Sequence, residues 1–157
     1  MAKQKSFIEV FNHTDIRIPK AKIVEFSEKS LKILAKNHRL SFQDAMLTIV
    51  FVSATEIRRL NKQYRKKDKP TDVLSFSSDF ALGELVLCPE VIKKYAQEHQ
   101  VRIFDELTYV VLHGILHLLG YDHETSPSDA KKMFQLQDQV YNRLAKQFSL
   151  RPVQKNS

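Results

Sequence analysis

The chain has 157 residues, of which 43% are hydrophobic, so it can close one core and is too short for two ordinary domains. Cys88 is the only cysteine, which excludes an internal disulfide and a metal site built from several thiolates. Lys and Arg outnumber Asp and Glu by 25 to 18, and the formal charge of +7 favours anionic partners such as nucleic acid. No apolar run approaches the roughly 20 residues that span a bilayer, and the first residues lack the apolar stretch of a signal peptide. We therefore expect one cytoplasmic domain that covers residues 1–157.

The first third of the chain predicts a strand, a helix and a second strand. Apolar and aromatic residues mark a strand at residues 7–11, and Pro19 suits the first position of a helix that runs to about residue 37. Residues 45–52 form an almost continuous apolar run, which is typical of a central strand buried on both faces. The inner face of the helix is expected to consist of Ile23, Phe26, Ser30, Leu31 and Leu34.

A second helix is predicted directly after the central strand. Ser53 and Glu56 have the spacing of a capping box, in which the serine caps the first free amides and the glutamate reaches back. Ile57, Leu60 and Tyr64 would then form the buried stripe of the helix. The helix is expected to end in the charged stretch that follows.

The middle of the chain predicts a pair of short strands and another helix. Residues 73–77 and 84–87, separated by a loop that contains Gly83, are expected to form a hairpin-like pair. Pro89 begins a helix that reaches about residue 100. Strands and helices mix without strict alternation, which predicts an α+β fold with a small mixed sheet of about four strands.

The C-terminal part predicts two helices. Residues 104–119 form a long apolar helix ended by Gly120, where a left-handed turn is sterically cheap. A terminal helix begins at Ser126, and the polar tail beyond Leu150 is expected to fray. The terminal helix has one apolar face, formed by Met133, Leu136, Val140, Tyr141 and Leu144.

Three of the six histidines lie close together in sequence, at His113, His117 and His123. Residues four apart share one face of a helix, so the first two imidazoles can reach one metal ion at roughly 2.0 to 2.1 Å. Gly120 lets the chain turn so that His123 supplies a third nitrogen, which leaves a fourth tetrahedral position for water. The alternative is that His113 and His117 are hydrogen-bonded core histidines. The combined spacing favours a metal site, with zinc as the expected ion.

The residue after the first histidine separates this site from a peptidase. The spacing is that of the zincin pattern H-E-x-x-H-x-x-G-x-x-H, but Gly114 occupies the position of the glutamate. That glutamate is the general base of the peptidases, so ordinary zincin proteolysis is not expected. Asp122 is either a turn residue or a group that orients water or an imidazole. Glu106 is either a carboxylate behind the ligands or, as we favour, a residue that stabilises the helix N-terminus.

Residues 58–69 concentrate seven basic residues against one acid, the densest positive stretch of the chain. Arg58, Arg59 and Lys62 suit the solvated face of an amphipathic helix. Arg65 lies at the helix end, just before a strand, where its guanidinium can project into a cleft and grip a phosphate bidentately. A metal site together with such an arginine suggests phosphodiester hydrolysis.

These residues resemble the YbeY family of bacterial endoribonucleases. Residues 113–123 match its His-Gly-x-x-His-Leu-x-Gly-Tyr-Asp-His run, and residues 60–76 match its Leu-Asn-x-x-Tyr-Arg-x-Lys-Asp-x-Pro-Thr-Asp-Val-Leu-Ser-Phe run. Residues 82–87 are similar to the Leu-Gly-Asp-Ile strand of the family. The resemblance covers roughly residues 45–145 and departs at Ser77, where the family usually has proline after Ser-Phe.

The resemblance implies a zincin-like α+β fold with one zinc ion held by His113, His117 and His123, and with Arg65 as a further catalytic residue in the cleft. It also implies a single-stranded RNA substrate, a role in maturing the 3′ end of 16S ribosomal RNA and in ribosome quality control, and ribosomal or small-subunit protein partners. A zinc-dependent endoribonuclease is therefore the leading hypothesis. Two rivals are a zincin-type metallopeptidase and a non-catalytic, ribosome-associated RNA-binding protein with structural zinc.

Overall fold

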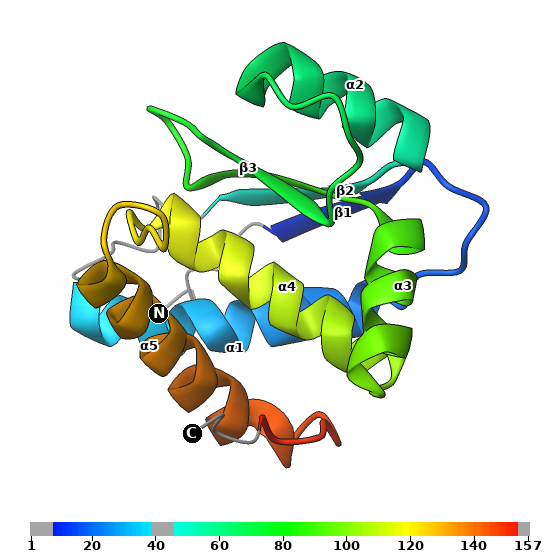
Figure 1. The fold of residues 1–157 in the computed structure, drawn as a ribbon. Coiled ribbons are helices and arrows are strands. Elements are labelled where there is room, and N and C mark those ends of the chain that lie inside the picture. The colour runs from blue at the N-terminus through cyan, green and yellow to red at the C-terminus, as the bar shows by residue number, and fades with distance from the viewer. Residues whose placement is uncertain (1–7, 39–45, 154–157) are drawn as a thin grey trace.

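A mixed four-stranded sheet lies at the centre of the fold (Figure 1), within the residues that the computed structural model describes, 8–38 and 46–153. The strand order is β1-β2-β4-β3. The strands β1 (Ile8–Asn12), β2 (Leu47–Phe51) and β4 (Gly83–Leu87) run parallel, and β3 (Val73–Ser77) pairs antiparallel with β4 at the edge. The predicted hairpin-like pair and the predicted α+β class are both confirmed.

Helices cover both faces of the sheet, in unequal numbers. The helix α2 (Ala54–Arg65) lies alone on the upper face in Figure 1. On the opposite face α1 (Lys20–His38) packs against β1, and α4 (Ile103–Leu118) packs against β3 and β4. The helix α3 (Pro89–His99) packs beside α4, and α5 (Pro127–Ala145) packs on α1 and α4 from the outer side. None of the helices in the described part of the chain combines the length and the apolar character needed to cross a membrane.

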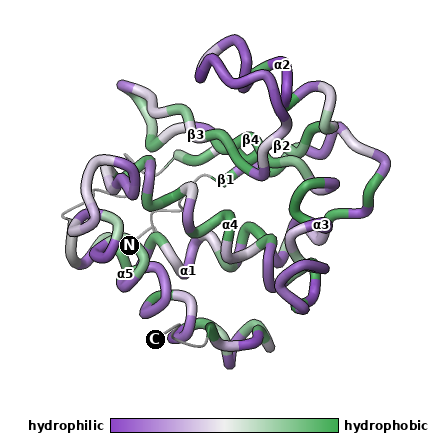
Figure 2. The backbone as a smooth tube through the Cα atoms, viewed as in Figure 1, coloured by the Kyte–Doolittle hydropathy of each residue, from purple (hydrophilic) through white to green (hydrophobic). Residues whose placement is uncertain are grey.

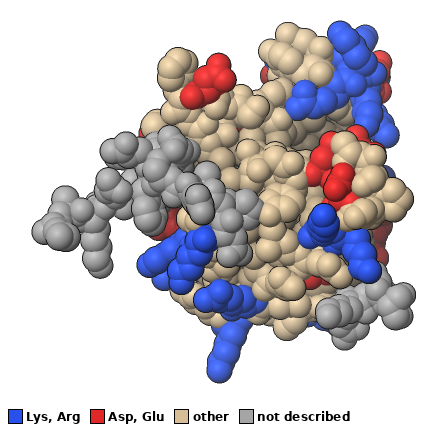
Figure 3. All heavy atoms as spheres, turned by 90° about the vertical axis from the view of Figure 1, so that its left-hand side faces the viewer, with Lys and Arg blue, Asp and Glu red and all other residues tan. Residues whose placement is uncertain are grey.

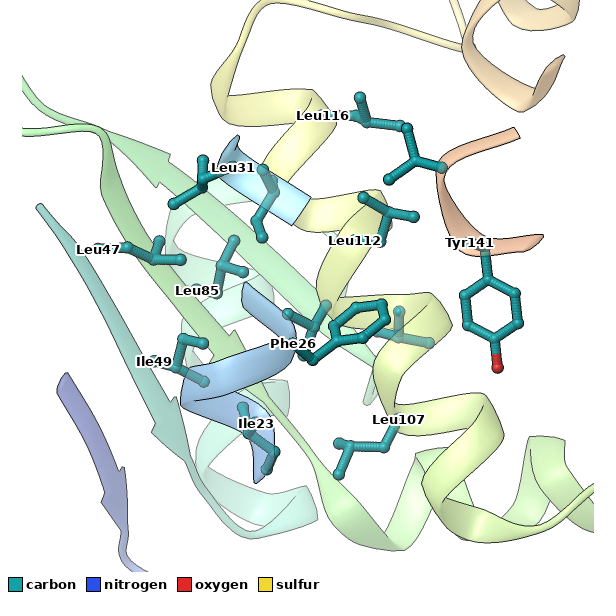
Figure 4. Close-up of a cluster of buried hydrophobic side chains, with 14 of the residues drawn as sticks. Ile23, Phe26, Leu31, Leu47, Ile49, Leu85, Leu107, Leu112, Leu116 and Tyr141 are labelled. Carbon is teal, nitrogen blue, oxygen red and sulfur yellow. The ribbon is translucent and has the colours of Figure 1, made fainter. Parts of the chain in front are cut away.

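The main core lies between the sheet and the helices α1 and α4 (Figure 4). Leu47, Ile49 and Phe51 on β2 and Leu85 and Leu87 on β4 are all buried on this face. The tube in Figure 2 is mostly hydrophobic along the sheet and α4 and mostly hydrophilic along α2. The inner face predicted for α1 is confirmed, because all five of its residues are buried: Ile23, Phe26, Ser30, Leu31 and Leu34.

A second, smaller core lies on the α2 side of the sheet and includes Val52, Ile57, Leu74, Val86 and Cys88. On this side the β2 residues Thr48 and Val50 are only partly buried. The central position predicted for β2 is therefore confirmed, whereas complete burial on both faces is not, because a single polar helix covers the upper face.

The start of α2 follows the sequence prediction, but its buried stripe is shorter than predicted. The Ser53 hydroxyl accepts the Glu56 N–H at 3.2 Å, while both oxygens of the Glu56 carboxylate accept from Arg59 instead of reaching back. Tyr64 is 52% exposed, so its predicted burial is wrong. Its ring packs on Phe76 of β3, with ring centroids 5.2 Å apart, and β3 is the edge strand, so the last turn of α2 lies at the margin of the sheet.

Two glycines shape α4. Gly114 faces the sheet, where an added Cβ would lie 2.7 Å from Leu85 Cδ2, so the absence of a side chain brings the helix close to β4. Gly120, just beyond the helix end, has φ +99°, as predicted for a left-handed turn. The chain reverses there, and residues 121–126 lead into α5.

The last helix and the start of the tail pack on the rest of the molecule. The Ser126 side chain caps α5 by accepting the Asp129 N–H at 3.0 Å, and the predicted apolar face of α5 packs into the core. In the tail that was expected to fray, the Arg151 N–H donates to Asp105 at 3.2 Å and the Val153 N–H donates to Asn142 at 2.8 Å. Residues 154–157 of that tail lie outside the described residues.

Candidate metal centre

The fold brings the three clustered histidines together. His113 and His117 lie one turn apart on α4, and His123 approaches from the loop after Gly120. The His113 and His117 ring centroids lie 4.6 Å apart, and each lies 5.1 Å from that of His123. One ligand nitrogen from each ring lies within 4.8 Å of the other two, so the three side chains can hold a metal ion.

A buried glutamine fixes the tautomer of His113. Gln137 of α5 is fully buried, and its amide nitrogen donates to the Tyr109 carbonyl at 3.2 Å. Its Oε1 must therefore face His113 Nδ1, which lies 3.0 Å away and carries the proton. The Nε2 atom of His113 then presents a lone pair to the site, which is the state that a metal ligand requires.

The nitrogens at the centre of the cluster have the spacing of ligands to one ion. His113 Nε2 and His117 Nε2 lie 3.1 Å apart, close to the roughly 3.3 Å that separates two nitrogens bound to one tetrahedral zinc ion. The backbone of Tyr121 also interacts with the His117 imidazole and acts to raise its pKa, against the effect of burial. The Nδ1 atom of His123 is buried without a hydrogen-bond partner in the described part of the chain. This donor set of three imidazoles fits zinc.

The surroundings favour the neutral form of the two helical ligands. Burial lowers the pKa of His113, and the imidazole of His123 acts in the same direction against the Gln137 hydrogen bond. Burial also lowers the pKa of His117, with the two neighbouring imidazoles adding to the effect. Both side chains are therefore uncharged at neutral pH and available as ligands.

The histidines line a cavity with a volume of about 860 Å³. Its lining also includes Arg65, Lys67, Lys69 and Phe134. Arg65, which sequence alone could not place beside the histidines, thus lies on the wall of the same cavity. Figure 3 views the molecule from the left-hand side of Figure 1, and Lys and Arg side chains gather in its upper right part, at the level of α2.

Three contacts hold Arg65 in place. Its Nη2 donates to the Ser75 carbonyl on β3 at 2.8 Å, its Nη1 donates to the Tyr64 carbonyl at 3.4 Å, and its guanidinium carbon lies 5.2 Å from the centre of the Phe76 ring. The remaining N–H groups leave donors for an anion in the cavity. In contrast, the exposed Arg58 and Arg59 pair with Asp68 and Glu56, at 2.8 Å and 2.7 Å, as expected of a solvated helix face.

The structure shows the surroundings of two acidic residues. Asp122 accepts the Glu124 N–H at 2.8 Å, as a turn residue does, and it also lines the cavity, where its charge acts to raise the pKa of His117. Glu106 lies 2.9 Å from His99 Nδ1 and lines a separate cavity of about 420 Å³, so it is not a carboxylate behind the metal ligands. The residue behind His113 is Gln137, which sequence analysis missed. Gln137 could have been noticed in the sequence as a polar side chain on the otherwise apolar inward face of α5.

Comparison with known proteins agrees with this geometry. The model of the family described as Endoribonuclease YbeY matches residues 9–145. The chain belongs to the YbeY endoribonuclease family. The resemblance noted in the sequence is thereby confirmed, as is the prediction of an enzyme of the hydrolase class that cuts RNA.

Individual relatives cover most of the chain. The protein named Endoribonuclease YbeY from Bdellovibrio bacteriovorus is 50% identical over 105 residues, which are 66% of this chain and 70% of the relative. The protein of the same name from Petrotoga mobilis is 38% identical over 145 residues, 88% and 96% of the two chains. The solution structure of TM1509 from Thermotoga maritima superposes with a TM-score of 0.63 at 32% identity and covers 91% of this chain and 92% of that one.

Proposed function

We propose that this YbeY family member is a zinc-dependent endoribonuclease that cleaves single-stranded RNA, and that residues 1–157 act as one domain in the cytoplasm. The observation that carries the proposal is one cavity that contains both the three imidazoles and Arg65. His113, His117 and His123 are its metal ligands and Arg65 is its phosphate-binding residue. The excess of basic over acidic residues supports an anionic substrate.

The three imidazoles define what the metal would supply. Zinc held by three protein ligands acts as a Lewis acid and makes water nucleophilic at neutral pH. The chain keeps these ligands neutral through burial and fixes the orientation of His113 through Gln137. Gly114 offers no carboxylate for proton abstraction, which speaks against the metallopeptidase rival, and the open cavity beside the histidines speaks against a purely structural zinc site.

Arg65 supplies the positive charge that phosphodiester cleavage requires. Negative charge grows on the non-bridging oxygens as a nucleophile attacks phosphorus, and a preorganised guanidinium stabilises that charge. The Ser75 carbonyl and the Phe76 ring hold Arg65 without neutralising it, because neither carries a negative charge. Its charge is therefore available to the substrate.

We also infer the biological substrate. The resemblance in residues 60–76 and 113–123 implies ribosomal RNA, with maturation of the 16S 3′ end and ribosome quality control as the processes, and the ribosome or small-subunit proteins as partners. Sequence-specific recognition of RNA mostly targets single-stranded segments, which suits an enzyme whose metal ligands and Arg65 share one cavity.

The test is cleavage of labelled single-stranded RNA by zinc-loaded protein. We expect Arg65→Ala to lower kcat by about 10²- to 10³-fold, as does loss of one group that stabilises transition-state charge, with zinc content unchanged. Arg65→Lys should recover part of the rate, because lysine restores the charge but not the bidentate geometry. Arg59→Ala is the matched control, since this arginine lies on the same helix but pairs with Glu56 outside the cavity.

Three outcomes would count against the proposal. Undiminished cleavage by both Arg65→Ala and His117→Ala would identify a contaminating nuclease. Equal losses in Arg65→Ala and Arg59→Ala would assign the effect to general surface charge. Chelator-sensitive cleavage of peptides without cleavage of RNA would favour the metallopeptidase.

A further inference from the structure

Phe134 is an aromatic side chain in an unusual position. It lies in the second turn of α5, where its neighbours Met133 and Gln137 are fully buried, yet it is 40% exposed. Its ring stacks on His113, with centroids 6.0 Å apart and planes 22° apart, and lies 5.8 Å from the His123 ring. Phe134 is also one of the residues that line the cavity. A flat apolar surface is thus open beside the metal ligands.

The cavity offers two kinds of surface to a ligand. Arg65, Lys67 and Lys69 provide positive charge in a lining that also includes the acidic Asp72, Asp122 and Glu124, while Phe134 provides an apolar aromatic face. A nucleotide has the matching two parts, a charged phosphate and a flat base. Aromatic side chains in single-strand binding sites stack on bases while basic groups follow the backbone. The pairing of surfaces in this cavity therefore fits a nucleotide better than a free anion.

We propose that Phe134 stacks on one unpaired base of the RNA next to the scissile phosphate and thereby contributes to the selection of single strands. The inference rests on the proposed nuclease function and adds a specificity-determining residue to it. Stacking requires an open base face, and in a duplex both faces are covered by neighbouring base pairs. A paired nucleotide cannot meet Phe134 without leaving its helix.

A purely structural role would not need this ring. Covering the rings of His113 and His123 requires an apolar side chain, and leucine provides one. Leucine lacks the planar π surface on which a base stacks. The Phe134→Leu variant therefore separates shielding of the ligands from recognition of a base, and Phe134→Trp should retain recognition.

The experiment compares wild type, Phe134→Leu and Phe134→Trp on a single-stranded RNA that has one cleavage site and carries one abasic nucleotide at each position in turn. For wild type we expect one abasic position near the cleavage site to lower kcat/KM by about tenfold, the typical effect of one lost stack. Phe134→Leu should show that loss on intact RNA and no further loss at that position. Phe134→Trp should behave like wild type.

Phe11→Leu is the matched control, because Phe11 is 43% exposed but lies on β1, at the opposite edge of the sheet from β3. Zinc per chain is measured for every variant. If Phe134→Leu cleaves intact RNA like wild type, or its loss is explained by lost zinc, the stacking role is refuted while the nuclease function stands. If wild type cleaves no RNA, both are refuted.

Discussion

At its N-terminal end, α4 carries two buried carboxylates whose partners belong to the protein. Asp105 accepts from the Arg102 guanidinium at 3.0 Å and from the Arg151 N–H at 3.2 Å. Glu106 lies 2.9 Å from His99 Nδ1. Each acidic group is thus matched by a basic or donating one, and the result is a structural network that fastens α3 and the tail to α4.

At its C-terminal end, the same helix and the loop that follows it carry three histidines, one of which has a buried nitrogen that is unmatched within the described residues. The Nε2 atoms of His113 and His117 face each other at 3.1 Å, and His123 Nδ1 is buried without a partner in the described part of the chain. The two ends differ in that a buried polar group indicates a ligand site when it lacks a hydrogen-bond partner within the protein. Matched groups indicate stability alone.

The largest expected difference between the two ends is in metal binding. We expect His117→Ala to reduce zinc from about one ion per chain to near zero, because two imidazoles do not form a stable site, and to abolish RNA cleavage. His99→Ala, at the other end, should keep both. Metal analysis of the purified variants, alongside cleavage assays, checks this. Comparable zinc loss in both variants would remove the distinction between the ends.

A smaller effect is expected from the hydrogen bond behind His113. Gln137→Leu removes the acceptor for the Nδ1 proton and should weaken zinc affinity by about 10- to 100-fold, as other outer partners of metal ligands do. Gln137→Glu keeps an acceptor at that place and should retain most of the affinity. Gln139→Leu, on the exposed face of α5, is the control. Competition with a chelator measures the affinity, and equal values for Gln137→Leu and wild type would contradict the assigned tautomer.

The smallest effect concerns the structural end and depends on pH. Burial raises the pKa of Asp105, but the Arg102 and Arg151 hydrogen bonds outweigh it, so the folded pKa lies below the unfolded value. Asp105 therefore stabilises the fold above the unfolded pKa of about 3.9, and this contribution is lost as the pH falls through the folded pKa. We expect Asp105→Asn to lower the free energy of unfolding by about 1–3 kcal/mol at neutral pH, with a shrinking difference in acid.

Denaturant unfolding of both proteins at several pH values checks the Asp105 prediction. Zinc content and cleavage should stay unchanged, because Asp105 does not line the cavity of the histidines. The exposed Asp79 provides the control substitution Asp79→Asn. A difference that stays constant from neutral to acidic pH would show that the charge of Asp105 contributes nothing.

Local patterns in the sequence were sufficient to predict the helices, the strands and the histidine cluster. The spacing of His113, His117 and Gly120 depends only on helix geometry and on one turn, both of which are local. Gln137 was missed because it lies 24 residues from His113, and the contact depends on how α5 packs on α4. Tyr64 was placed wrongly because periodicity indicates the inner face of a helix but not where the supporting sheet ends.

The strand order and the position of Arg65 also depend on tertiary structure. Nothing in residues 45–52 or 84–87 indicates that β2 pairs with β4 rather than with β3. This pairing places β3 at the edge, where the Ser75 carbonyl receives Arg65 next to the histidines. The segment that contains Arg65 could be identified from its composition, whereas its distance from the metal ligands could not.

The contact between Gly114 and Leu85 also limits how this site can be engineered or can evolve. A change from glycine to glutamate would restore the zincin pattern in one step, but the new Cβ would meet Leu85 Cδ2 at 2.7 Å, so the Leu85 side chain or the ligand-bearing helix would have to shift. A route from this nuclease to a peptidase therefore includes repacking of Leu85 or a smaller residue at position 85. The packing of one strand residue thus adds a cost to the conversion of the helix above it by a single substitution.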